Sequence, residues 1–209
     1  MKSITFFTTV TLFLAIGLFG FITIGESGGS AKGCPEQTAV AKKYQIKSAK
    51  VTFKTEITGI FGESILYFDD YGAKELLEKY KKGILTEATL ADGKELYAIK
   101  YDQKAAYKMT GAERGVAYRF DWNEISTSDR GANAKKLPNV TIAGKNCESY
   151  SFETPSIQTI YAGWKNICLL TELKMKMKIG KSITKADRIE ENVIIPAEKF
   201  KIPAGFQIK

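Results

Sequence analysis

Short segments in which apolar and polar residues alternate fill the chain from Ala49 to Met109. A period of two is typical of β-strands that are buried on one face. The breaks between the segments hold residues that tolerate a positive φ or cap their own backbone, which predicts hairpins and hence an antiparallel meander. These breaks are Gly59, Asp69-Asp70-Tyr71-Gly72, Lys82-Gly83 and Asp92-Gly93. The expected strands are Val51–Ile57, Ser64–Phe68, Lys74–Tyr80, Ile84–Leu90, Lys94–Tyr101 and Ala105–Met109.

The alternation resumes after Pro138, and it is strictest from Leu173 to Ile179, where every second residue is lysine. One face of that strand is therefore expected to be apolar and the other to be solvated. Between the two halves, residues 111–136 break the pattern. We interpret them as a loop that covers one end of the sheet with Trp122 as its plug, or else as a functional or mobile loop. The expected strands of the second half are Val140–Ala143, Cys147–Thr154, Ile157–Ala162, Ile167–Ile179 and Ile183–Ile194.

These segments add up to about ten or eleven strands, with one or two helices. A sheet of that size curls, and if it does not close it needs something packed into its concave side. The expected fold class is therefore mainly β (α+β), with a single curved antiparallel sheet or unclosed half-barrel under one or two covering helices.

The N-terminal residues predict export. Lys2 precedes an uncharged apolar run from Ile4 to Ile24, and small residues follow up to Ala31. This pattern is typical of a signal peptide over residues 1–31. The run is also long enough to span a bilayer, so a retained membrane anchor is the alternative. Residues 32–44 are interpreted as a tether with a short helix from Pro35 to Tyr44, and residues 45–209 as one β domain.

The chain has three cysteines, an odd number for an exported protein. Cys147 and Cys168 are out of phase with the apolar residues around them, which predicts that both thiols point to the outer face. They could form a disulfide, although an expected strand between them makes the distance long. Buried thiols, or pairing of either residue with Cys34, are the alternatives. Cys34 is also a candidate for lipidation, but Lys32 inside that motif fits the signal poorly.

The formal net charge of the chain is +8 at pH 7, and residues 1–31 hold only Lys2 and Glu26. The excess therefore belongs to the β domain and favours an acidic or anionic partner. The basic residues are scattered rather than gathered in one stripe, which argues against nucleic acid. An anionic membrane surface or an acidic protein is the expected partner.

The chain contains no histidine. This excludes Ser-His-Asp and Cys-His catalysis and removes the commonest metal ligand. The three cysteines are too dispersed for a zinc site, and Gly180-Lys181-Ser182 lacks the upstream glycine of a phosphate loop. We therefore expect a protein that is not an enzyme and that has no metal and no cofactor.

Several passages of the β domain carry a resemblance to a known family. They are Ile65-Leu66-Tyr67-Phe68-Asp69-Asp70-Tyr71-Gly72, Ile189-Glu190-Glu191-Asn192-Val193 with Ile195-Pro196 and Phe200-Lys201-Ile202-Pro203-Ala204-Gly205-Phe206, and the turns Ala143-Gly144-Lys145-Asn146-Cys147 and Gly163-Trp164-Lys165-Asn166-Ile167. Residues 45–209 resemble the LolA/LolB superfamily of bacterial lipoprotein carriers, and most closely an uncharacterised branch of exported β-rich proteins. The resemblance implies an unclosed half-barrel whose hollow receives acyl chains. The arginine with which LolA is thought to latch its lid has no match here.

In a carrier of this kind, the inward-facing positions of the strands would line the ligand site. A slip of one residue in any strand would turn that strand's set outward. The phase of the alternation assigns to this hydrophobic lining Val51, Phe53, Ile57, Tyr97, Ile99, Tyr107, Tyr150, Phe152, Leu173, Met175, Met177 and Ile179.

Two functions are consistent with this sequence. The first is a monomeric binding protein, in the bacterial periplasm or tethered to the membrane and facing the periplasm, that holds a lipid or other hydrophobic ligand in its concave face. The second is a structural or interaction protein of the cell envelope, in which the same positions form a filled core and the basic outer face binds an acidic protein.

Overall fold

The computed structural model describes residues 42–92, 95–109, 122, 134–176 and 180–209. Among these residues, two short 3-10 helices, η1 (Asp70–Gly72) and η3 (Ala197–Phe200), accompany the strands. The strands are β1 (Ala49–Ile57), β2 (Ile60–Asp69), β3 (Lys74–Lys81), β4 (Ile84–Asp92), β5 (Glu95–Lys100), β6 (Ala105–Lys108), β7 (Ala134–Ile142), β8 (Lys145–Glu153), β9 (Ile157–Trp164), β10 (Ile167–Met175), β11 (Gly180–Glu191) and β12 (Gln207–Ile208).

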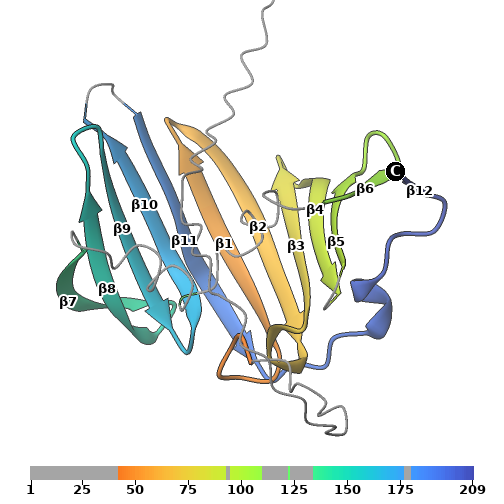
Figure 1. Ribbon diagram of the computed structural model, residues 1–209, viewed down its shortest axis with the longest axis horizontal. Helices are drawn as coiled ribbons and strands as arrows, with labels where there is room; N and C mark the ends of the chain where they lie inside the picture. Colours follow the sequence, from red (N-terminus) through yellow and green to blue (C-terminus); the bar gives the residue numbers. More distant parts are fainter. Residues whose placement is uncertain (1–41, 93–94, 110–121, 123–133, 177–179) are drawn as a thin grey trace, which may run out of the picture. The chain divides into compact units, whose positions relative to one another are not determined.

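All twelve strands belong to one curled, unclosed sheet (Figure 1). Their order is β12-β6-β5-β4-β3-β2-β1-β11-β10-β9-β8-β7. Neighbouring strands are antiparallel except β12, which pairs in parallel with β6. The sheet thus consists of two meanders, β1 to β6 and β7 to β11, which meet where β1 pairs with β11. The predicted fold class is confirmed, and every predicted strand overlaps one of these strands.

The largest difference from the predicted strands is at β7, which begins at Ala134, inside the region interpreted as a loop. Pro138 lies within β7, where it is tolerated because β7 is an edge strand and its pairing with β8 shifts register between Leu137 and Val140. The helix expected from Pro35 to Tyr44 lies mostly outside the described residues, and Lys42–Tyr44 are not helical.

The register defines two faces of the sheet, because residues directly opposite each other on antiparallel strands point to the same side. Val51, Leu66 and Leu77 stand opposite one another on β1, β2 and β3. We call their side the strap face, because residues 43–46, the strap, pack on it. The other side is the tail face, because residues 192–206, the tail, pack on it.

The strap holds the main apolar core in place. Tyr44 is fully buried, and its ring centroid lies 4.2 Å from that of Phe68. The backbone N–H of Tyr44 donates to the carbonyl of Tyr71 at 3.0 Å, and that of Gln45 donates to the carbonyl of Lys165 at 3.2 Å. The strap therefore runs from η1 to the turn between β9 and β10. The buried cluster that it closes contains Tyr44, Ile46, Ala49, Val51, Phe53, Leu66, Phe68, Leu77, Ile142, Cys147, Ala162, Ile167, Leu169 and Ala186.

Trp122 covers the sheet at β9 and β10. Its side chain is only 6% exposed, and its backbone N–H donates to the carbonyl of Asn166 at 2.9 Å. Gly163 makes room for the ring, since a Cβ there would lie 2.1 Å from Cδ2 of Trp122. The ring centroid also lies 5.8 Å from that of Tyr150. Trp122 therefore covers the sheet as predicted, whereas residues 111–121 and 123–133 of the predicted loop lie outside the described residues.

The tail forms a second core on the opposite face. Phe200 of η3 packs with Leu76, Ala88, Leu90, Ile99 and Ala106, and Ile195, Ile202 and Phe206 add to the cluster. The carboxylate of Glu78, which is 3% exposed, accepts hydrogen bonds from the Tyr80 hydroxyl at 2.7 Å and from Nζ of Lys199 at 2.5 Å. An ion pair thus fastens the tail to β3.

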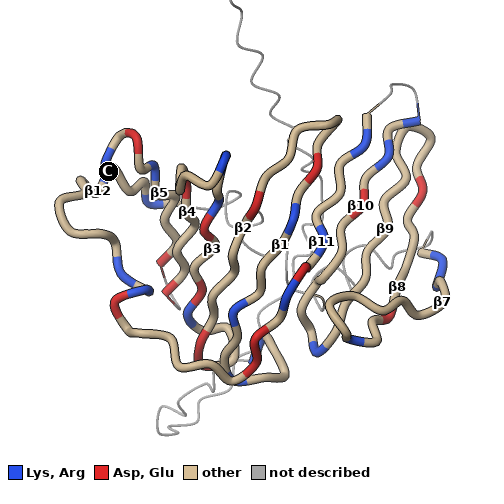
Figure 2. Tube along the Cα trace, turned by 180° about the vertical axis from the view of Figure 1, so that it is seen from behind, with Lys and Arg blue, Asp and Glu red and all other residues tan. Residues whose placement is uncertain are grey.

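Beyond the region that the tail covers, the tail face of the central strands is solvated. Figure 2 shows basic and acidic residues intermixed along β2, β1, β11 and β10. Lys174 and Lys181 both approach Glu172, at 3.2 and 3.3 Å, and Lys50 approaches Glu190 at 3.5 Å. The solvated face predicted for the Leu173 strand is confirmed for Lys174. Exposed ion pairs of this kind contribute about 0–1 kcal/mol each to the free energy of unfolding, so their main effect is to keep this face polar and solvent-exposed.

The ion pair of the tail can be tested with Lys199→Ala. Removal of the ammonium leaves the buried Glu78 carboxylate with the Tyr80 hydroxyl alone, so we expect a loss of about 1–3 kcal/mol in the free energy of unfolding. Urea unfolding measures it. The control is Lys201→Ala, two residues along the tail at an exposed position, which should change stability by less than about 0.5 kcal/mol. Equal losses in the two variants would contradict the role of the pair.

Glu191 should make stability depend on acid pH. A hydrogen bond from Lys145 and the nearby Lys165, whose Nζ lies 3.3 Å from Oε2, lower the pKa of Glu191 from its ordinary 4.5, although burial opposes this. Because the folded pKa is the lower one, the stabilisation is present above about pH 5 and is lost as the pH falls through the folded pKa. Glu191→Gln should cost about 0.5–1 kcal/mol at pH 7 and flatten the loss of stability between about pH 5 and pH 3. An unchanged acid slope in urea unfolding would contradict this.

Candidate functional site

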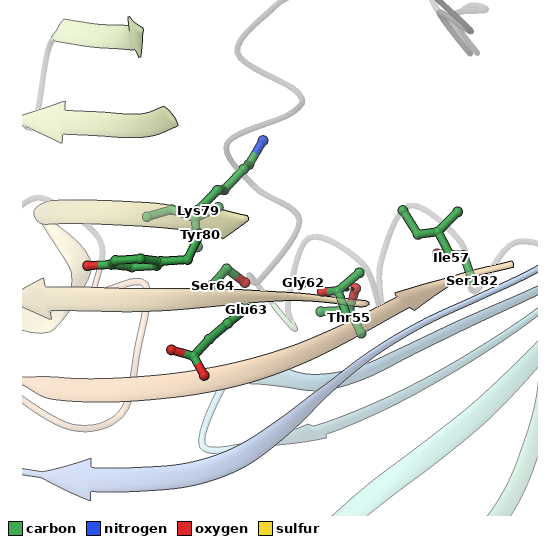
Figure 3. Close-up of a pocket in the computed structure, with 10 residues that line it drawn as sticks. Thr55, Ile57, Gly62, Glu63, Ser64, Lys79, Tyr80 and Ser182 are labelled. Carbon is green, nitrogen blue, oxygen red and sulfur yellow. Dashed lines mark hydrogen bonds between the residues drawn. The ribbon is translucent and has the colours of Figure 1, made fainter. Parts of the chain in front are cut away.

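The strap face holds a pocket at the point where β2 and β3 part. Their pairing ends at Glu63 and Tyr80, but β2 continues along β1 to Ile60, and β3 continues along β4 to Lys81. A pocket of about 260 Å³ lies at this fork (Figure 3). Its lining residues are Thr55, Ile57, Gly62, Glu63, Ser64, Leu77, Lys79, Tyr80, Ser182 and Thr184.

The lining is amphipathic. Ile57 and Leu77 are apolar, whereas β1, β2 and β11 contribute hydroxyl groups, two of which, Oγ1 of Thr55 and Oγ1 of Thr184, lie 3.1 Å apart. Figure 3 shows Lys79 and Tyr80 to one side of the pocket and Ile57 and Ser182 to the other. The volume lies near the lower limit of small-molecule sites, which are about 300–1,000 Å³. Such a pocket can hold one end of an elongated apolar ligand.

Gly62 makes this hollow possible. A Cβ added there would meet only the carbonyl oxygen of Tyr80, at 3.7 Å, which is an ordinary contact. The site therefore has room for a side chain that the sequence does not supply. Gly62 was not predicted as a site residue, because a glycine in a strand gives no signal in the apolar alternation.

The ionisable groups at the pocket are engaged in structural contacts. Glu63 pairs with Lys54, and Lys79 lies 3.6 Å from Glu87. Burial and the hydrogen bond to Glu78 raise the pKa of Tyr80 far above its ordinary value, so its phenol stays protonated. These side chains contain no activated nucleophile and no base poised for proton transfer. Among the described residues, no group of three or more Cys, Asp or Glu could hold a metal ion.

The predicted hydrophobic lining is divided among several places. Val51 and Phe53 are buried in the core beneath the strap, at 0% and 1% exposed, whereas Ile57 is 52% exposed and lines the pocket. Tyr107, Tyr150, Phe152, Leu173 and Met175 share the strap face by register and are half-buried. Met177 and Ile179 lie outside the described residues.

Tyr97 and Ile99 lie on the tail face instead. They stand opposite Lys108 and Ala106 on β6 and pack in the cluster that contains Phe200. The reason is that the apolar phase changes sides along the sheet. It faces the strap on β1 and β2 and faces the tail on β4 and β5, and the alternation within a strand does not tell which side is covered.

The pocket also contains residues that the sequence analysis missed. They are Thr55, Ser64 and Thr184, and each points to the same face of its strand as a nearby apolar residue. The apolar residues are Phe53 on β1, Leu66 on β2 and Ala186 on β11, respectively. The sequence could have indicated these residues, because small hydroxyl residues occupy the inward-facing positions of the strands where the apolar residues stop. Alternation alone ranks them as polar and therefore assigns them no place in a binding site.

For the two cysteines of the β domain, the structure shows the alternative of buried thiols and not the disulfide. Cys147 and Cys168 form no disulfide with each other, and both are buried rather than on the outer face. Cys147 packs in the strap cluster, and burial raises the pKa of its thiol. A register shift between Cys168 and Leu170 places Cys168 opposite Gly163, where it packs with Trp122. The bulge breaks the phase on which the prediction relied.

The predictions for the N-terminus lie outside the described residues. These are the signal peptide or anchor over 1–31, the tether from residue 32, and lipidation or pairing of Cys34. Within the described part of the chain, no helix is long and apolar enough to cross a membrane.

No family model and no curated protein sequence matches this chain. Solved structures do resemble it. An uncharacterized conserved protein from Thermus thermophilus has a TM-score of 0.55 at 10% identity, over 80% of this chain and 92% of that one. The complex of MucA and MucB from Pseudomonas aeruginosa contains a chain with a TM-score of 0.55 at 11% identity, over 81% of this chain and 60% of that one.

A structure of MucB by itself gives a TM-score of 0.53 at 12% identity, and the alignment covers 80% of this chain. The chain spans 61% of the length of that MucB chain. At such identities the likeness concerns the fold. The predicted resemblance is thereby confirmed at that level: this chain has the LolA-like fold, which it shares with MucB.

Proposed function

We propose that this chain is an exported, non-enzymatic binding protein of the bacterial cell envelope that holds part of a lipid or other hydrophobic ligand in the pocket at the β2–β3 fork. The observation that carries the proposal is an unfilled amphipathic pocket at the open end of a filled core. An acyl chain would contact Ile57 and Leu77, and a polar head would find the hydroxyl groups of Thr55, Ser64 and Thr184. The LolA-like fold agrees with this role.

The structure limits how much of a ligand the site can take. The strap and Phe68 fill the strap face at one end, and Val51 and Phe53 are buried beneath it. The proposed ligand therefore enters from the fork and not along the whole face. Beyond the pocket, Leu173 stands opposite Ser182 and is half-buried, so it could extend the apolar contact over β10.

The filled core favours a second candidate, an interaction protein that binds an acidic partner. A solved complex pairs MucB with MucA, so a protein of this fold can bind another protein. For this chain, the lysine-rich tail face of β10 and β11 would be the binding surface. This candidate needs no ligand in the fork.

Native mass spectrometry of the full chain, produced in a bacterial periplasm, separates the two candidates. If the chain is a carrier, a fraction of it should bear extra mass that organic extraction removes and identifies as lipid. A folded chain with a clean mass, which also takes up no added fatty acid or phospholipid, would overturn the carrier proposal and leave the interaction protein.

Substitutions at Gly62 test the pocket itself. Its backbone is not left-handed and a Cβ fits, so Gly62→Ala should fold, with unchanged or slightly higher stability. Gly62→Val and Gly62→Phe should fill the hollow progressively, and binding of a fluorescent fatty acid should fall in that order, by at least about tenfold for phenylalanine. Circular dichroism checks that each variant folds. Undiminished binding by a folded Gly62→Phe chain would show that the fork is not the site.

A further inference from the structure

Exposed large apolar side chains gather at two hairpin tips. Among the described residues, those most exposed are Ile57, Ile60, Phe61, Ile84, Val140, Ile194 and Ile208. Four of them belong to the β1–β2 tip and the β3–β4 tip, and Ile60, Phe61 and Ile84 are 70%, 72% and 68% exposed. A folded chain does not gain stability from apolar groups held in water, so a concentration of them marks a contact surface.

The two tips lie at the same end of the sheet, on either side of the fork between β2 and β3. The last pair that joins β2 and β3 is Glu63 with Tyr80, and beyond it the pocket at the fork lies between the two tips. The β1–β2 tip also touches the start of β11, since the N–H of Thr58 donates to the carbonyl of Lys181 at 3.0 Å. Both tips thus carry protruding apolar groups at this end of the sheet, and we call Ile57, Ile60, Phe61 and Ile84 together the tip surface.

The charges beside the tip surface are mainly positive. Lys81 and Lys82 are exposed at the β3–β4 tip and form no ion pair with a described residue. Lys181 is exposed as well and shares Glu172 with Lys174. Within the β1–β2 tip, Glu56 is an exposed carboxylate, whereas Glu63 is half-buried and paired with Lys54. The net balance fits an anionic surface that also accepts apolar groups.

We propose that the tip surface docks the domain on an anionic bilayer, with Ile60, Phe61 and Ile84 inserted among the head groups and Lys81 and Lys82 against the lipid phosphates. Protruding aliphatic and aromatic groups on loop tips suit a deformable interface, and basic residues beside them supply the electrostatic part of binding. The tip surface also borders two pockets, since Ile57 lines the pocket at the fork and Ile84 lines another one of about 440 Å³.

This inference goes beyond the proposed ligand site and is tested separately. The full chain is mixed with vesicles of phosphatidylcholine, with or without phosphatidylglycerol, and amide hydrogen exchange is followed by mass spectrometry. Docking should protect residues 56–62 and 81–85 only when phosphatidylglycerol is present. The turns at the other end of the sheet, residues 70–73 and 164–166, serve as an internal reference. An anchored N-terminus by itself would not protect one end and spare the other.

A triple variant, Ile60→Ser with Phe61→Ser and Ile84→Ser, should lose the protection at the tips. Because none of these residues lines the pocket at the fork, fatty-acid binding should stay as in the unchanged chain. Lys81→Gln with Lys82→Gln should weaken the association roughly fivefold per lysine, and added salt should reproduce this. The inference is overturned if vesicles protect neither tip, if the triple variant is protected like the unchanged chain, or if concentration of the chain protects the tips without lipid, which would indicate a second copy.

Discussion

An open sheet cannot bury both of its faces by itself, and the organisation of this chain depends on how each face is covered. Tyr44 of the strap lies against Phe68 on one face, and Phe200 of the tail lies over Leu76 and its neighbours on the other. Burial of a large side chain contributes about 1.5–3 kcal/mol, far more than any of the exposed ion pairs. Just after the strap, Ser48 contacts the start of the tail: its carbonyl accepts from the N–H of Asn192, and its hydroxyl donates to the carbonyl of Val193.

The candidate site is a consequence of this division. The strap covers the strap face at one end only, and the apolar phase gives way to small hydroxyl residues as β1, β2 and β11 run toward the other end. The fork between β2 and β3 then opens a pocket that neither covering reaches, and Gly62 keeps it unfilled. The same end carries the protruding groups of the tip surface. Stability and candidate binding functions thus occupy opposite ends of the sheet.

Local alternation and turn residues were sufficient to predict the two meanders, because hairpin pairing is decided within a few residues. They could not predict where the meanders join, since the pairing of Val51 with Ile189 depends on residues far apart in the sequence. Nor could they tell which side of β5 is covered, because the answer lies in the tail, which has no alternation of its own. The bulge at Cys168 and the hollow at Gly62 were missed for a related reason. Each is a local break in the apolar–polar alternation, and the alternation itself does not predict where it breaks.

The position of β11 has a consequence for how the chain can fold. β1 is the first strand of the sheet in the sequence, yet one of its two edges is satisfied only by residues 180–191, near the end of the chain. The tail that covers β3 to β6 comes later still. During synthesis, the first meander must therefore wait with an open edge and an uncovered face until almost all of the chain has emerged. Such a delay leaves the unfinished meander without stable tertiary structure and dependent on protection from aggregation.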